Sequence, residues 1–302
     1  MSRRQHYADL YDGPRRDGRP LAVVHGNCQA GALQVLLSGA PAFGWQVARV
    51  PPVHELTADD LPAYDRLLAA STLLLAQPVR DGYRGLPLGT SEVAARLAPG
   101  AVVVRWPVVR WQGLHPWQAI VRAVDGAEPP VVPYHDLRTL TGRTPVGADL
   151  VAAEAASRAE LVRREVRDCD VAVSDLLTGA GAVHTLNHPG NRLLLGLAHR
   201  VQALLGAPQD AADPGRVLLG EVRAPLEPEV LAALGLDPAE ARDCWLVGGE
   251  QVAAAAVVQA HSAWYAGRPD VVEEGLSRYA DRLVLLGLDQ AGGQPGSADR
   301  QR

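Results

Sequence analysis

Short apolar runs alternate with helical stretches between Leu21 and about Pro133, and this alternation restricts the fold more than any other feature. The runs are LAVVH, WQVARV, LLLAQPV and AVVVRWPVV, and helical stretches such as CQAGALQVLLSG and TSEVAARLA lie among them. Strands of this length, rich in Val and Leu and separated by helices, are typical of a buried parallel sheet. The sequence therefore predicts an α/β fold in which a Rossmann-like parallel sheet is flanked by helices.

After about Gly147 the pattern changes, because apolar residues recur at three- and four-residue spacing. This spacing predicts a mostly helical C-terminal subdomain. We expect an α/β subdomain over 21–145, which carries the Cys28 loop, and a mainly helical subdomain over 146–288 packed on it. One compact unit and two domains are equally compatible with this pattern. Segments 1–20 and 289–302 are polar and lack periodicity, which predicts flexible tails.

Composition excludes several classes of function. The 29 Lys and Arg residues against 34 Asp and Glu give a formal charge of −5, and no basic run predicts a nucleic-acid partner. No window approaches the roughly 18 apolar residues of a membrane span. The N-terminus lacks the apolar stretch of a secretory signal, which favours a cytoplasmic protein. The three cysteines form no CxxC pair, so neither a disulfide framework nor a metal site is expected.

The segment VVHGNCQ places Cys28 where a buried strand passes into a helix. Gly26 permits a tight turn, and the side chain of Asn27 is able to hydrogen-bond within it. Because ligands bind beyond the carboxyl ends of parallel strands, Cys28 is expected in a functional pocket. The helix N-terminus is expected to lower the pKa of its thiol and so favour a nucleophile. The alternative is an inert cysteine packed beneath the helix.

A second polar group is HTLNHPGN, directly before the amphipathic helix RLLLGLAHRVQALLG. Asn187 and His188 precede Pro189, which is expected at the first helical position. A histidine at such a helix entry is suited to act as a general base or an orienting donor. The alternative is a helix cap with a surface imidazole.

Three further loops follow apolar runs and are expected on the same rim as Cys28. Their arginines have the geometry to hold an anion such as a phosphate, although each one alone is better explained as a solvated loop charge. The loops contribute Gln77, Arg80, Tyr83 and Arg84, then Arg110 and His115, then Tyr134 and Asp136.

These motifs, taken in order, resemble a known family. The series HGNCQ, QPVRDGYRG with LGTSEV, GLHP, PYHD and TLNHPGNRLL, from about Leu21 to Gly206, is similar to the WcbI-like family of polysaccharide-biosynthesis proteins. The resemblance implies coenzyme A (CoA) binding and acetyl transfer to a sugar hydroxyl. It also places around a shared site Cys28, Gln29, Gln77, His115, Asn187 and His188, with Tyr134 and Asp136 as weaker members.

The leading hypothesis is therefore an acyltransferase that uses acyl-CoA as co-substrate and needs no metal. Cys28, His188 and His115 are the expected catalytic residues, and Gly26 and Asn27 belong to the binding residues. Either Cys28 carries the acyl group covalently, or a histidine activates the acceptor directly and Cys28 lines the site. The expected partners are a small-molecule acyl donor and a sugar-like acceptor, and an oligomer is possible.

Two other functions fit the same residues. One is a cysteine esterase or thioesterase, because strand, Gly-Asn-Cys and helix resemble the nucleophile turn of SGNH hydrolases. The other is a non-catalytic module that binds CoA or a related ligand. A hydrolase needs no acceptor and no CoA, whereas a transferase is stabilised by CoA through binding linkage.

Overall fold

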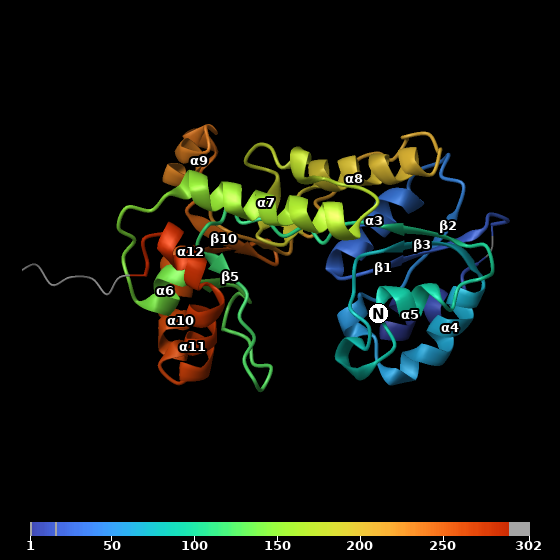
Figure 1. The fold of residues 1–302 in the computed structure, drawn as a ribbon, viewed down its shortest axis with the longest axis horizontal. Helices are drawn as coiled ribbons and strands as arrows, with labels where there is room; N and C mark the ends of the chain where they lie inside the picture. Colours follow the sequence, from blue (N-terminus) through green and yellow to red (C-terminus); the bar gives the residue numbers. More distant parts are fainter. Residues whose placement is uncertain (1, 16, 290–302) are drawn as a thin grey trace, which may run out of the picture. The chain divides into compact units, whose positions relative to one another are not determined.

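The computed structural model describes residues 2–15 and 17–289, which divide into two compact units (Figure 1). Unit 1 contains the described residues up to 110 together with 159–220, and unit 2 contains 111–158 and the described residues from 221 onward. The division therefore differs from the sequence-predicted boundary near 145. The chain enters unit 2 at Trp111 and returns to unit 1 at Ala159, within the long helix α7 (Leu150–Asp168).

Unit 1 is built on a four-stranded parallel sheet of order β2-β1-β3-β4. Its strands are β1 (Leu21–His25), β2 (Gln46–Ala48), β3 (Ser71–Ala76) and β4 (Val102–Arg105). All five residues of β1 are buried, because a central strand of a layered parallel sheet is covered on both faces. The prediction of an α/β fold with a parallel sheet is confirmed.

Helices cover this sheet and pack apolar side chains against it. The α-helices with a part in unit 1 beyond the N-terminal segment are α3 (Cys28–Ser38), α4 (Leu61–Ala69), α5 (Thr90–Ala94), α7 and α8 (Asn191–Leu204). Tyr64 and Leu68 of α4 pack with Val23 and Leu74 in one buried cluster, and α3 packs against α8. Short 3-10 helices occupy Val53–Glu55, Ala58–Asp60, Tyr83–Gly85 and Ser174–Leu176.

The described part of the N-terminal segment contains two short helices, where a flexible tail over 1–20 was expected. It forms helices α1 (Arg3–His6) and α2 (Ala8–Tyr11). Leu10 is buried in the sheet cluster, and the Arg3 guanidinium pairs with Asp60 at 3.0 Å. One apolar anchor and one ion pair to a buried carboxylate hold a segment whose composition alone predicts disorder. In the expected C-terminal tail, residues 290–302 lie outside the described residues.

Unit 2 has its own apolar core and is mainly helical, which confirms the prediction of a helical C-terminal region. Val271, Leu283 and Leu286 pack with Leu137 and Leu140. Besides the first part of α7, its elements are β5 (Gln118–Ala119), β6 (His135–Asp136), α6 (Leu137–Thr141), β9 (Val222–Arg223), α9 (Pro228–Ala233), a 3-10 helix (Pro238–Glu240), β10 (Cys244–Val247), β11 (Glu250–Ala253), α10 (Ala254–Tyr265), α11 (Pro269–Arg278) and α12 (Ala280–Leu285).

An antiparallel sheet of order β11-β10-β9 was not predicted from the sequence. The segment EQVA reads as the start of the helix that follows, but it pairs back on β10. Gly248 and Gly249 connect the two strands with φ values of 59° and 89°. Two residues with positive φ are typical of a tight hairpin turn, so the Gly-Gly pair was the signal for this sheet.

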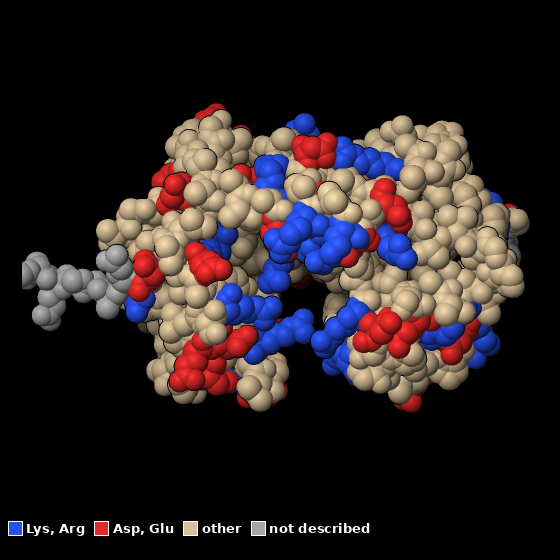
Figure 2. Space-filling model, viewed as in Figure 1, with Lys and Arg blue, Asp and Glu red and all other residues tan. Residues whose placement is uncertain are grey.

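Charges on the surface are paired. Figure 2 shows a group of basic side chains where Figure 1 draws the later part of α7, with acidic side chains beside it. Arg158, Arg163 and Arg164 of this helix form ion pairs with glutamates one turn earlier. None of the helices formed by the described residues has the length and apolar content needed to cross a lipid bilayer.

Candidate functional site

The turn between β1 and α3 is shaped by a close approach of two segments. A Cβ atom on Gly26 would lie 2.5 Å from Oε1 of Gln77, so the turn requires glycine here. The backbone N–H of Asn27 donates to the same Oε1 at 2.8 Å, and Oδ1 of Asn27 accepts from the N–H of Gln29 at 2.9 Å. Asn27 therefore caps α3 and fixes Cys28 as its first helical residue.

Gln29 and Gln77 form a buried network that joins four segments of unit 1. Nε2 of Gln29 donates to the backbone carbonyls of Val109 and Asn187, both at 2.8 Å. Its Oε1 accepts from the N–H of Val109 at 3.0 Å and from Nε2 of Gln77 at 3.1 Å. The two glutamines are 0% and 1% exposed, and their amides position the surrounding loops.

Cys28 differs from its predicted state. Burial raises the pKa of the Cys28 thiol to about 11, and the Glu55 carboxylate adds to the increase. The N–H groups of Cys28 and Gln29 lower this pKa, as expected at a helix N-terminus, but the desolvation is larger. The predicted thiolate is therefore corrected: at neutral pH this group is a protonated thiol.

Cys28 lines a cavity of about 490 Å³ within unit 1, here called the Cys28 cavity. Arg49, which directly follows β2, and Arg216 contribute guanidinium groups to it. Nη2 of Arg49 lies 2.7 Å from Nε2 of His6, which also lines the cavity. The remaining lining residues are Tyr7, Gly31, Ala32, Gln34, Val35, Ser38, Val50, Pro52, Leu218 and Leu219.

The sequence reasoning missed both arginines of the Cys28 cavity. For Arg49 a signal existed, because it lies near the end of the run WQVARV, directly after β2, and so emerges at the same sheet edge as Cys28. For Arg216 there was none, since 206–220 has no periodic pattern. Leu219 beside it has a φ of 53°, a left-handed conformation that is costly for leucine and is often found at binding sites.

The NHP segment is a hairpin, which corrects the predicted helix entry. Strands β7 (Val183–Thr185) and β8 (His188–Pro189) pair antiparallel, and α8 begins only at Asn191. Pro189 thus occupies an edge position in the hairpin instead of the first helical turn. Burial lowers the pKa of His188 to about 4, so its imidazole is neutral at physiological pH.

The loop after β3 lies apart from the Cys28 cavity. Arg80 and Arg84 are exposed and Tyr83 is half-buried, and the described residues that line the cavity include none of the three. Nη1 of Arg84 donates to the backbone carbonyl of His54 at 2.6 Å. The backbone carbonyl of Arg110 accepts from Arg164 at 3.3 Å.

The other predicted site residues belong to unit 2. His115, Tyr134 and Asp136 line a cavity of about 660 Å³ formed entirely by residues of that unit, here called the unit 2 cavity. Gln77, Asn187 and His188 belong to unit 1 together with Cys28, whereas His115, Tyr134 and Asp136 belong to unit 2. Among residues 2–15 and 17–289, no group of three or more His, Cys, Asp or Glu is arranged to hold a metal ion.

The comparisons agree with the motif order. The family model described as polysaccharide biosynthesis enzyme WcbI matches residues 21–210. A solved structure of WcbI, described as a novel polysaccharide biosynthesis enzyme in a native form without a disulfide bond between CoA and a cysteine, has a TM-score of 0.76 and 21% identity. The match covers 88% of this chain and 97% of that chain. No curated protein sequence matches. Because the family model spans well over half of the sequence, the chain belongs to the WcbI family of polysaccharide biosynthesis enzymes.

Proposed function

We propose that the chain is a CoA-dependent acyltransferase, which moves an acyl group, acetyl in the simplest case, to a hydroxyl of a sugar-like acceptor. Membership of a polysaccharide biosynthesis family supports the acceptor class. The description of the WcbI structure, which mentions a disulfide between CoA and a cysteine of that protein, supports the donor. We assign the equivalent position to Cys28.

The observation that carries the proposal is the composition of the Cys28 cavity. CoA has a thiol at one end and phosphate groups at the other. The cavity combines a cysteine with Arg49 and Arg216, and guanidinium groups are well suited to phosphate. Its lining therefore fits both the thiol end and the phosphate end of the donor. A cysteine packed in an apolar core would have no such partners for the phosphates.

The protonation states favour direct transfer. With a pKa of about 11, Cys28 is a weak nucleophile at neutral pH. In the direct route a neutral histidine accepts the proton of the acceptor hydroxyl, whose oxygen attacks the thioester carbonyl carbon. The carbon–sulfur bond then breaks, and the departing CoA sulfur takes up a proton. We assign the base to His188, whose segment is joined to the first turn of α3 through Gln29. His115 is the second candidate.

Mass spectrometry of the full chain mixed with acetyl-CoA distinguishes the routes. The direct route predicts no acetyl group on Cys28 and measurable turnover by Cys28→Ser, with Cys169→Ser as the matched control. An acetylated Cys28 together with an inactive Cys28→Ser variant would establish the covalent route instead. Release of acetate without any acceptor would assign the chain to the hydrolases.

Thermal stabilisation by CoA tests the donor site. We expect CoA and acetyl-CoA to raise the melting temperature through binding linkage. Arg49→Ala and Arg216→Ala should weaken this effect, and Arg80→Ala, which removes an exposed arginine outside the cavity, should not. The absence of a shift with either CoA species would contradict the proposal.

A further inference from the structure

The unit 2 cavity is larger than the Cys28 cavity, and its walls are of two kinds. Elements far apart in the sequence build it: the segment around β5 and β6, the start of α6, the loop before α9, β10 and α10. Most of its exposed lining is apolar, with polar groups gathered on one side. A roomy apolar pocket with a few fixed polar groups is the usual form of a small-molecule site.

Three aromatic side chains form the apolar wall: Trp117, Tyr134 and Trp245. The rings of Tyr134 and Trp245 are nearly parallel, with an interplanar angle of 17° and centroids 6.3 Å apart. All three side chains are nearly buried, with 4–8% of their surface exposed. They therefore give the cavity a rigid apolar backing and leave little of their ring faces open to a ligand.

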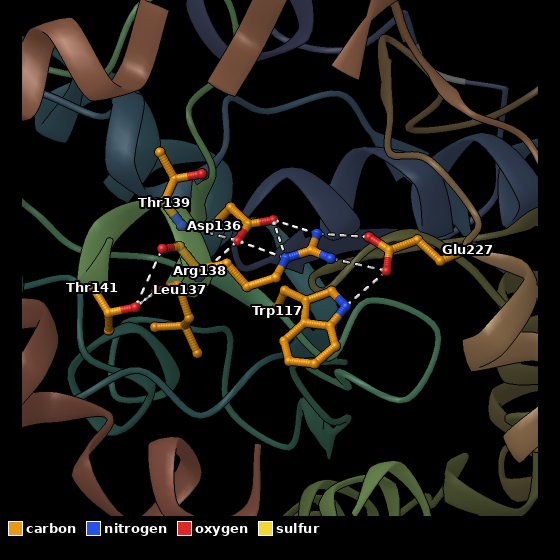
Figure 3. A network of polar contacts seen from close by, with 7 residues as sticks. All are labelled: Trp117, Asp136, Leu137, Arg138, Thr139, Thr141 and Glu227. Carbon is orange, nitrogen blue, oxygen red and sulfur yellow. Dashed lines mark hydrogen bonds and ion pairs between the residues drawn. The ribbon is translucent and has the colours of Figure 1, made fainter. Parts of the chain in front are cut away.

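The polar wall is a fixed network, which Figure 3 shows from close by. Nη2 of Arg138 pairs with Oδ2 of Asp136 and with Oε1 of Glu227, both at 2.7 Å. Nε1 of Trp117 donates to Oε2 of Glu227 at 2.9 Å. The Arg138 guanidinium lies 4.7 Å from the ring centroid of Trp117. The network therefore holds its own geometry before any ligand arrives.

The charged side chains of this network are only partly buried. The side chains of Asp136 and Glu227 are each 24% exposed, and that of Arg138 is 33% exposed. Carboxylate oxygens accept hydrogen bonds and a guanidinium donates them. Neighbouring hydroxyl groups of one ligand are therefore able to bond to an acceptor and a donor that lie side by side. An apolar chain without hydroxyls would leave these groups unpaired, which costs free energy.

The charge of the cavity lining is nearly balanced. Its residues include Asp136, Glu227 and Asp243 against Arg138 and Arg242. Two of the lining histidines add no positive charge at neutral pH, because burial lowers the pKa of His135 to about 4 and also lowers that of His261. The lining therefore has no excess of positive charge to hold a ligand with several phosphates, which favours a neutral ligand.

We propose that the unit 2 cavity binds a neutral glycosyl ring, with the apolar lining of the cavity against the C–H face of the ring and the Asp136–Arg138–Glu227 network on its hydroxyls. A sugar is also the acceptor class of the proposed function, and this link alone rests on that function. The binding itself does not depend on it. The wall formed by residues 224–261 lies beyond the family-model match at 21–210, so Glu227 and Trp245 do not belong to the part of the sequence that defines the family.

The test is a calorimetric titration of the full chain, without CoA, with neutral methyl hexopyranosides, the corresponding methyl uronates, and cyclohexanol as an apolar probe. We expect saturable binding of at least one neutral glycoside, and weaker binding of its uronate and of cyclohexanol. Glu227→Gln should weaken glycoside binding about tenfold, the usual cost of a lost hydrogen bond to a charged group, whereas Glu229→Gln on the exposed side of α9 should not.

A second variant keeps the test independent of the ion-pair network. Val258 lines the cavity from α10 yet is 45% exposed, so Val258→Trp should fill the cavity without disturbing the core. Val284→Trp, at a 60% exposed position of α12 outside the lining, is the matched control. Loss of glycoside binding in Val258→Trp alone supports the proposal. Equal binding by both variants, preference for cyclohexanol, or binding of no neutral glycoside would overturn it. CoA binding is measured separately, so failure of one proposal is distinguishable from failure of the other.

Discussion

Nε2 of Gln29 donates a 2.8 Å hydrogen bond to the backbone carbonyl of Asn187, across 158 residues of sequence. This bond joins the first turn of α3 to the hairpin that carries His188. Two motifs that stand far apart in the chain are thereby part of one buried network in unit 1, which also includes Gln77 and Val109.

Replacing Gln29 by Met should destabilise the protein strongly. Methionine fills the space but leaves buried carbonyls and an N–H group without partners, each at a cost of about 1–3 kcal/mol. We expect a loss of at least about 3 kcal/mol in the free energy of unfolding, measured by urea denaturation. Gln34→Met, on the same helix but partly exposed, should change stability by less than about 0.5 kcal/mol. Similar losses in both variants would contradict the structural role of the network.

Gly26→Ala should disrupt the Cys28 turn. The added Cβ would meet Oε1 of Gln77 at 2.5 Å and its Cδ at 2.9 Å, which forces Gln77 away from the N–H of Asn27. The expected loss is about 1–3 kcal/mol, together with weaker CoA binding. Gly31→Ala, in the interior of α3 with no neighbour within 4 Å, should instead stabilise by about 0.5–1 kcal/mol. Chemical denaturation of both variants compares the two effects, and a harmless Gly26→Ala would show that the turn tolerates a side chain.

Alkylation of Cys28 by iodoacetamide should be slow at neutral pH. Because burial raises its pKa to about 11, the rate should increase about tenfold per pH unit up to that value. Peptide mapping by mass spectrometry follows Cys28 separately from the other cysteines. Glu55→Gln should accelerate the reaction, since the Glu55 carboxylate contributes to the raised pKa. A rate that levels off near pH 8 would mean that the helix N-terminus, and not burial, determines the pKa of Cys28.

Stability should decrease between pH 6.5 and pH 4. Burial lowers the pKa values of His25, His135 and His188 to about 4, whereas an unfolded chain binds these protons near pH 6.5. The unfolded state therefore holds more protons across this window, and each histidine removes up to about 3 kcal/mol as the pH falls through it.

Urea denaturation at several pH values measures the slope. His135→Phe lowers stability at pH 7, because it removes the 2.7 Å bond between Nδ1 and the Tyr265 hydroxyl, yet it should also flatten the slope. A stability that is constant from pH 6.5 to pH 4 would refute the assignment of neutral, buried histidines.

The sheet and its helices could be predicted because their signals are local. The buried run LAVVH and the cap by Asn27 depend on neighbouring residues, and both appear in the structure as expected. The pKa of Cys28 could not be predicted in the same way. It is set by desolvation from packed segments, and this outweighs the helix N-terminus, which was the part visible in the sequence.

The candidate site was predictable only where the sheet-edge rule applied. That rule predicts a pocket at Cys28, which lines a cavity in the structure, and it would also have found Arg49 after β2. It does not reach Arg216, which stands in a segment without periodicity, or Glu227, which begins the helical stretch EPEVLAALG. Both reach their cavities through tertiary packing. The division of the three predicted loops between two units likewise has no local signal, because it arises from the path of the chain through 111–158.

That path has a consequence for biosynthesis on the ribosome. Unit 1 receives its last segment, 159–220, only after the first part of unit 2 has been made, and Arg216 is among its final residues. The sheet is able to form early, but the Cys28 cavity acquires its full lining late. A nascent chain halted at residue 210, where the family match ends, would hold the cysteine without Arg216, so assembly of the Cys28 cavity lags behind assembly of the fold.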